Sequence, residues 1–288
     1  MACSDLWSIS RLRKHLSNYG IHLEKGKGQH FLLDRDALAE IVNCLETNGP
    51  VLEVGAGVGS LTCLLIGRFS PIWAIEIDEA FRRPFNDNCG SEKSTHFVNK
   101  DFLEVDESEF LISPSNSASI VGNIPYHLSV PILEKVIDNR NLYSQGAFTL
   151  QKEVADKLLS SPGSRDVTPL TFLVRSYAEV ELVQEIPASS FFPTPEVDSC
   201  TVRLDFLSEP VFHSSKEVFF SVVRAAFNHR RKTIRNALRA NTQFSYSSEE
   251  IDRILDLAKI ESRLRPEQLD IEDYDRLARV VVDLSNTS

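Results

Sequence analysis

Long apolar runs are missing from this sequence, and no stretch approaches the roughly 18 consecutive apolar residues of a membrane span. The first residues, Met1 to Asp5, contain no apolar signal-peptide core. Cysteine is sparse, odd in number and without any Cys-x-x-Cys pair. The cysteines are Cys3, Cys44, Cys63, Cys89 and Cys200. This usage is typical of a reduced protein without structural zinc, so we expect a cytoplasmic protein with no membrane partner and no metal.

The composition is that of an ordinary globular protein, with 288 residues of which 42% are hydrophobic and 25% charged. The net charge of −10 argues at first against a nucleic-acid partner. Basic residues nevertheless gather in residues 1–33 and again between Arg224 and Arg239, a stretch without any acid. Because the strongly acidic positions 240–288 account for much of the negative net charge, that charge does not exclude a polyanionic partner.

Four successive predicted strands each end in a residue that can contact a ligand. They end at Gly55, Glu76, Asp101 and Asn123. In open α/β sheets, ligands bind at the carboxyl edge of the strands, so we expect these residues to lie together there.

The run Gly55-Ala56-Gly57-Val58-Gly59 follows a predicted buried strand, 50–54, and precedes a predicted helix, 60–66. Its Gly-x-Gly-x-Gly spacing differs from the dinucleotide pattern Gly-x-Gly-x-x-Gly. Glu53 suits a cationic sulfonium and amino group better than a pyrophosphate, and Glu76 suits ribose hydroxyls. The loop therefore favours S-adenosylmethionine over NAD, and an NAD-dependent dehydrogenase stays an alternative.

The stretch Asn123-Ile124-Pro125-Tyr126 ends the fourth strand. The Asn123 carboxamide oxygen and the Ile124 carbonyl are adjacent acceptors, and Pro125 stiffens the turn. Two such acceptors suit the exocyclic amino group of a nucleobase, and Tyr126 can stack on its ring.

The remaining residues predict the end of the first domain and a second domain after it. Residues 147–150 indicate a fifth strand, 152–160 a helix and 200–206 an alternating strand, whereas 172–183 fits either a strand or a helix. Beyond Pro210 the pattern is helical. We expect an α/β, Rossmann-like methyltransferase domain over 1–207 and a small all-helical, RNA-binding domain over 208–288.

One long helix is predicted from about Lys216 to Ala240. Its arginines recur at helical spacing beside an apolar stripe and mix with no acidic residue, as on a helix that follows phosphates. The candidate RNA-binding residues are Arg224, Arg230, Arg231, Lys232, Arg235 and Arg239.

Together these motifs resemble the ribosomal RNA adenine dimethyltransferases, in family order across roughly residues 25–270. The motifs are Gly28–Leu32, Gly55–Gly59, Asn123–Tyr126, Leu150–Ala155, Phe191–Pro195 and Arg224–Thr233. The arginine-rich stretch and helical tail are more similar to the bacterial small-subunit enzyme than to the large-subunit resistance enzymes.

The resemblance implies a set of donor contacts in addition to Glu53 and Gly57. They are His30, Leu32, Gly55, Glu76, Asp101 and Asn123. Glu76 would take the ribose hydroxyls and Asp101 the adenine amino group of S-adenosylmethionine, whereas Asn123 would lie between donor and acceptor. The family usually has asparagine where this chain has His30, and imidazole brings a titratable ring.

On the acceptor side, the resemblance implies a flipped-out adenine between Tyr126 and Phe191. The catalytic set is then Asn123, Ile124, Pro125, Tyr126 and Phe191. Asn123 and the Ile124 carbonyl would accept the two N6 hydrogens, and no side chain needs to remove a proton beforehand. The implied substrate is two adjacent adenosines in a 3′-terminal hairpin of 16S rRNA, within a pre-ribosomal 30S particle, and we expect a monomer. A large-subunit rRNA methyltransferase and a non-catalytic ribosome-assembly factor remain alternatives.

Overall fold

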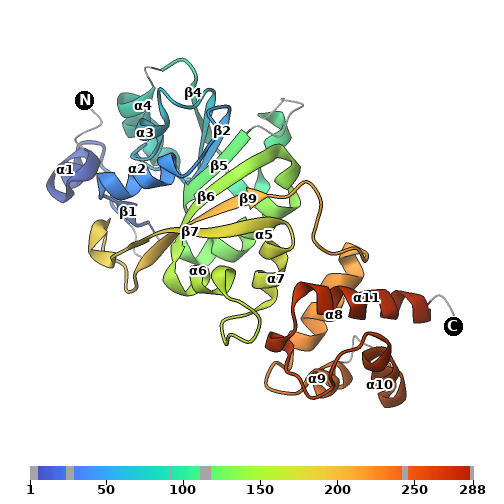
Figure 1. Cartoon of the computed structure of the whole chain (residues 1–288). Coiled ribbons are helices and arrows are strands. Elements are labelled where there is room, and N and C mark those ends of the chain that lie inside the picture. The colour runs from blue at the N-terminus through green and yellow to red at the C-terminus, as the bar shows by residue number, and fades with distance from the viewer. Residues whose placement is uncertain (1–5, 24–28, 91, 111–117, 242–245, 286–288) are drawn as a thin grey trace. The chain divides into compact units, whose positions relative to one another are not determined.

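The computed structural model describes residues 6–23, 29–90, 92–110, 118–241 and 246–285, so Cys3 and the motif residue Gly28 lie outside the described part. It divides the chain into two compact units (Figure 1). The first contains Met1–Ala155 and Ala178–Leu207, and the second contains Asp156–Tyr177 and Ser208–Ser288.

The first unit is built on a seven-stranded sheet in the order β4-β3-β2-β5-β6-β9-β7 (Figure 1). Its strands are β2 (Val51–Val54), β3 (Ile72–Glu76), β4 (Thr95–Asn99), β5 (Ala118–Asn123), β6 (Tyr143–Gln151), β7 (Ala178–Ile186) and β9 (Ser199–Phe206). The first five in sheet order are parallel, and β9 is antiparallel to both β6 and β7. This parallel-dominated sheet confirms the expected Rossmann-like α/β class.

Among the described residues, two helices precede the parallel strands and three more connect them, while a further helix follows β6. They are α1 (Ile9–Asn18), α2 (Arg35–Asn43), α3 (Thr62–Leu65), α4 (Arg82–Cys89) and α5 (Ser129–Asp138), while α6 (Lys152–Leu159) crosses the boundary of the units in sequence. The side chain of Asp34 caps α2 by accepting from the backbone amides of Asp36 at 3.0 Å and Ala37 at 3.1 Å. All four residues of β2 are buried, as expected of a central parallel strand covered on both faces.

A second, two-stranded sheet joins segments that are distant in sequence. In it β1 (Phe31–Leu32) pairs antiparallel with β8 (Phe191–Phe192), with Leu32 opposite Phe191. The pairing connects the segment that follows His30 to the start of the proline-rich loop.

The second unit is helical, with α7 (Pro169–Arg175), α8 (Lys216–Phe227), α9 (Ile234–Ala240), α10 (Ser248–Leu257) and α11 (Ile271–Ser285). The undecided stretch 172–183 is thus the end of α7 followed by the start of β7. The ring of Phe172 lies 5.7 Å from that of Phe227 and 4.8 Å from that of Tyr274. These contacts explain why 156–177, which we expected in the first domain, packs with the C-terminal helices.

The prediction of one helix from Lys216 to Ala240 is wrong. The chain leaves α8 after Phe227 and starts α9 at Ile234. Thr233 has extended backbone geometry, and its hydroxyl accepts from the Asn236 amide at 3.4 Å, so it begins a new helix. The arginines of this stretch therefore do not share one continuous helical face.

Candidate active site

A cavity of about 600 Å³ in the first unit lies at the carboxyl ends of β2, β3 and β5. It brings together all the predicted donor residues and most of the predicted acceptor residues. The predicted residues that line it are His30, Leu32, Glu53, Gly55, Gly57, Glu76, Asp101, Asn123, Ile124, Pro125 and Tyr126.

The glycine loop needs glycine for its backbone shape. Gly55, Gly57 and Gly59 have φ of +77°, +53° and +88°, in the left-handed region that other residues rarely adopt. A Cβ added to Gly57 would lie 2.9 Å from the Phe31 ring, and one added to Gly59 would lie 2.6 Å from the Cys89 Sγ. The loop is thus both conformationally special and closely packed.

Glu76 ties this loop to the end of β3. Its two carboxylate oxygens accept from the backbone amides of Gly57 and Asp78, both at 2.9 Å. The side chain is buried, and burial raises its pKa, although the two amide hydrogen bonds oppose that shift. Glu76 is therefore held in one orientation at the rim of the cavity.

Glu53 is a second buried carboxyl, with only 2% of its surface exposed. The Thr62 hydroxyl donates to its Oε2 at 2.5 Å. Burial raises the pKa of Glu53 to about 8; the Thr62 bond lowers it, and the neighbouring Glu76 raises it further. Thr62 was not among the predicted site residues, and its only sequence signal is a hydroxyl in the first turn after the glycine loop.

The hydrogen bonds that the described residues give to these two carboxyls come from neutral groups. Buried carboxyls with neutral partners favour a cationic or hydroxyl-bearing ligand. The sulfonium, amino and ribose hydroxyl groups of S-adenosylmethionine fit that requirement.

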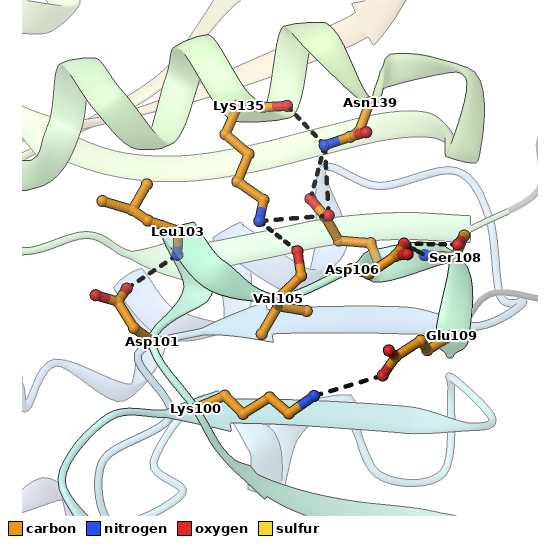
Figure 2. A network of polar contacts seen from close by, with 10 residues as sticks. Lys100, Asp101, Leu103, Val105, Asp106, Ser108, Glu109, Lys135 and Asn139 are labelled. Carbon is orange, nitrogen blue, oxygen red and sulfur yellow. Dashed lines mark hydrogen bonds and ion pairs between the residues drawn. The ribbon is translucent and has the colours of Figure 1, made fainter.

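Asp101 follows β4 and stabilises the turn that it begins. Its Oδ1 accepts from the Leu103 amide at 2.9 Å (Figure 2). Figure 2 also shows a network behind this turn, in which the Lys135 ammonium donates to the Val105 carbonyl. Lys135 lies 3.6 Å from the carboxylate of the buried Glu107, which also accepts from the Asn139 side chain at 3.3 Å. The network fixes the segment that carries Asp101.

Asn123, His30 and Tyr126 form a connected group on the acceptor side. The Asn123 carboxamide nitrogen donates to the His30 carbonyl at 2.8 Å, which leaves the Asn123 oxygen as the acceptor for a ligand. The His30 Nδ1 lies 2.6 Å from the Pro193 carbonyl, and its ring stacks on Tyr126 with centroids 5.3 Å apart. The Tyr126 hydroxyl lies 2.9 Å from the Ser199 hydroxyl. Three segments thus fix the position of Asn123.

Phe191 does not occupy the predicted place. It is fully buried in the core cluster that contains Leu32 and Leu38, and it is not among the residues that line the cavity. Its partner in β1 is Leu32, and this pairing turns the Phe191 ring inward. Phe192 is partly exposed, and the Arg13 guanidinium lies 4.7 Å from the centre of its ring. We expected one of the two phenylalanines to face the base and the other the core. Phe191 faces the core, and Phe192, which packs against a second core cluster, does not line the cavity either.

Some of the predicted RNA-binding residues of the second unit make contacts within the protein, and others are exposed to solvent. Arg235 makes a bidentate ion pair with Asp252 at 2.5 and 2.7 Å, and this bond lowers the pKa of Asp252. Arg230 donates to the Arg165 carbonyl. The exposed members of the set are Arg224, Arg231, Lys232 and Arg239.

The fold and this cavity define a Rossmann-type methyltransferase. A dimethyladenosine transferase from Plasmodium falciparum has the same fold, with a TM-score of 0.74 and 22% identity over 87% of this chain and 96% of that one. The 23S rRNA methyltransferase ErmE aligns with a TM-score of 0.66 and 25% identity over 88% and 99% of the two chains.

Sequence comparison is more specific. Residues 22–283 match the family described as ribosomal RNA adenine dimethylase, and the chain belongs to that family. The Ribosomal RNA small subunit methyltransferase A of Geobacillus thermodenitrificans is 34% identical over 97% of this chain and 98% of the relative. The protein of the same name from Clostridium botulinum is 32% identical over 93% and 98%. The predicted enzyme class is thus confirmed. Among the described residues, no helix combines the length and apolar character that crossing a membrane requires.

Proposed function

We propose that this protein transfers methyl groups from S-adenosylmethionine to the N6 atoms of two adjacent adenosines in a 3′-terminal hairpin of small-subunit rRNA, in a pre-ribosomal 30S particle. One observation carries the proposal. A single cavity joins two buried carboxyls suited to a cationic donor with an asparagine and a tyrosine suited to an adenine. We also propose that it acts in the cytoplasm as a monomer and needs no metal.

On the donor side, S-adenosylmethionine supplies a methyl group on a sulfonium when bound. Glu53 faces its positive charge, Glu76 accepts from the ribose hydroxyls, and Asp101 accepts from the adenine amino group. Gly55 and Gly57 allow the backbone to approach closely because they carry no Cβ.

On the acceptor side, Tyr126 stacks on the flipped adenine, and such a contact contributes about 1–3 kcal/mol. The Asn123 oxygen and the Ile124 carbonyl accept the two N6 hydrogens, so the nitrogen lone pair points toward the methyl group. Holding the atoms in line provides most of the acceleration. Because Asn123 is fixed by the His30 carbonyl, it is oriented before the RNA binds. The side chain that closes the pocket opposite Tyr126 is not Phe191, which is buried in the core.

The exposed basic residues of the second unit are proposed to contact phosphates of the rRNA. They are Arg224, Arg231, Lys232 and Arg239. Arg230 and Arg235 make intramolecular contacts in this structure, so we give them a secondary role.

The experiment compares wild-type protein with Asn123→Ala on immature small subunits and on large subunits, using labelled donor. We expect transfer to small subunits only, and a loss of about 100-fold or more in the variant, since misplacing a reacting group has effects of that size. Binding of S-adenosylhomocysteine, measured by calorimetry, should stay within a few-fold of wild type. Asn43→Ala, at an exposed position in α2, is the matched control. Normal transfer by Asn123→Ala would overturn the role of Asn123, and transfer to large subunits would identify the alternative substrate.

A further inference from the structure

Two cysteines meet directly behind the glycine loop. The Sγ atoms of Cys63, in α3, and Cys89, at the end of α4, lie 3.3 Å apart. Cys89 is buried, with 1% of its surface exposed, whereas Cys63 is partly exposed. Cys63 is therefore the member of the pair nearer to solvent, and the Cys89 sulfur is held against it.

Both cysteines also contact the third glycine of the loop. The Cys63 backbone amide donates to the Gly59 carbonyl at 2.9 Å, and the Cys89 Sγ lies 3.5 Å from that same oxygen. A Cβ on Gly59 would come within 2.6 Å of the Cys89 Sγ, so the Cys89 thiol packs directly against the loop. Both cysteines are thus in direct contact with Gly59, through the sulfur of Cys89 and the backbone amide of Cys63.

The cysteine pair is also connected to the buried carboxyl of Glu53, through Thr62. Thr62, next to Cys63, starts α3 and donates its hydroxyl to Glu53 at 2.5 Å. A disulfide has an S–S distance of about 2.05 Å, so closing the present 3.3 Å gap brings the sulfurs together by more than about 1 Å. Movement of Cys63 in α3 shifts the neighbouring Thr62, whose hydroxyl holds Glu53, a residue that lines the cavity.

We propose that Cys63 and Cys89 form a reversible disulfide on oxidation by hydrogen peroxide, and that this crosslink weakens binding of the methyl donor. Peroxide converts the Cys63 thiol to a sulfenic acid and leaves as one water. The Cys89 sulfur then attacks the Cys63 sulfur, the S–S bond forms, and hydroxide departs with the thiol proton as a second water. Two thiols lose two electrons, which reduce one peroxide to two waters, and a dithiol reductant reverses the change.

The inference rests on the proposed function only in that the cavity binds the donor, and its test needs no RNA. Reduced full-length protein is treated with peroxide and digested with trypsin and a glutamate-specific protease, which separates Cys44 from Cys63. Mass spectrometry should find a Cys63–Cys89 crosslink, and the number of titratable thiols should fall from the five in the sequence by two. A sulfenic acid on Cys63 without a crosslink, or a crosslink to another cysteine, would overturn the pairing.

Calorimetry with S-adenosylhomocysteine then measures the effect on the cavity. We expect affinity to fall by about tenfold or more after oxidation, the effect of losing one hydrogen bond to a charged or buried carboxyl, and to recover with dithiothreitol. Cys63→Ser should bind as reduced wild type does and should keep its affinity after peroxide. A crosslinked protein with unchanged affinity would overturn the coupling. Failure of even the reduced protein to bind would instead contradict the proposed function.

Cys44→Ser is the matched control. Burial raises the pKa of the Cys44 thiol to about 11, so this cysteine stays protonated and reacts slowly with peroxide. Its variant should lose affinity on oxidation as wild type does. Protection by Cys44→Ser would show that a different thiol is responsible.

Discussion

The buried carboxyl of Glu53 should make the stability of the first unit fall as pH rises. Burial raises its pKa to about 8 from an ordinary value of 4.5. Between these two values the folded protein holds the proton more tightly than the unfolded chain does, so each increase in pH favours unfolding. Below pH 4.5 Glu53 is protonated in both the folded and the unfolded protein, so its ionisation does not reduce the free energy of unfolding. Above pH 8 the reduction has reached its full size.

The size of the effect follows from the shift. One pKa unit corresponds to about 1.36 kcal/mol, so the full cost of ionising Glu53 is about 5 kcal/mol, an upper value because water entry and relaxation reduce it. Between pH 6 and pH 9 the change is about 2–3 kcal/mol. Glu76 acts in the same direction, because burial also raises its pKa.

The assay is urea unfolding of full-length wild type and Glu53→Gln at intervals from pH 6 to pH 9. Trp7 and Trp73 both lie in the first unit, so tryptophan fluorescence reports on the unit that contains Glu53. In the variant the Thr62 hydroxyl should still donate to the side-chain oxygen at position 53. Its free energy of unfolding should fall by about 2–3 kcal/mol less than that of wild type across this range.

The control is Glu104→Gln, because Glu104 is exposed in the same unit. Its stability should follow the wild-type dependence on pH. Parallel curves for wild type and Glu53→Gln would refute the reasoning, since the buried carboxyl would then titrate alike in the folded and unfolded states.

Calorimetry in buffers of different ionisation enthalpy should show that binding of S-adenosylmethionine near pH 7 releases a proton, because its cationic groups favour ionised Glu53; equal heats in all buffers would contradict this. Gly59→Ala should destabilise the first unit by about 1–3 kcal/mol in thermal unfolding, because φ is +88° and the new Cβ meets the Cys89 sulfur. Lys135→Met should cost up to about 3–5 kcal/mol by leaving Glu107 buried without its cation, and adding Glu107→Gln should restore most of that loss; additive losses would contradict the pairing. Replacing the four exposed basic residues of the second unit by alanine should weaken RNA binding and flatten its dependence on salt, whereas a variant at the ion-paired Arg235 alone should change the slope little.

The donor half of the site was predictable because parallel strands end at a common edge. Glu53, Gly55, Glu76, Asp101 and Asn123 lie on or just after four strands, and the sheet order places those ends around one cavity. Each strand was visible as a short apolar run, so the position of the polar residue that ended it carried the information.

The acceptor half was less predictable because it depends on pairing between distant segments. Alternation along a strand shows that Phe191 and Phe192 face opposite sides, but only the pairing of β8 with β1 decides which one is buried. The contact of Asn123 with the His30 carbonyl joins positions that local sequence patterns do not relate.

The prediction of one helix across the arginine-rich stretch failed because of a local capping signal. Its spacing fits one helix, but three consecutive basic residues, Arg230 to Lys232, precede Thr233, a residue type favoured at helix starts. Thr233 caps α9, so a new helix begins there although the apolar and basic residues keep helical spacing across the break. A search for capping residues inside the apparent helix would have found the break.

The second unit is made of two separate segments of the chain, and this limits where the protein can be truncated. A chain that stops at Leu207 keeps α7 but discards α8 and α11, against which the Phe172 ring packs. That truncation would leave an apolar helix uncovered, and the product should aggregate. Isolating the catalytic half calls for an internal deletion of 156–177, replaced by a short polar connection between Ala155 and Ala178, together with removal of the tail.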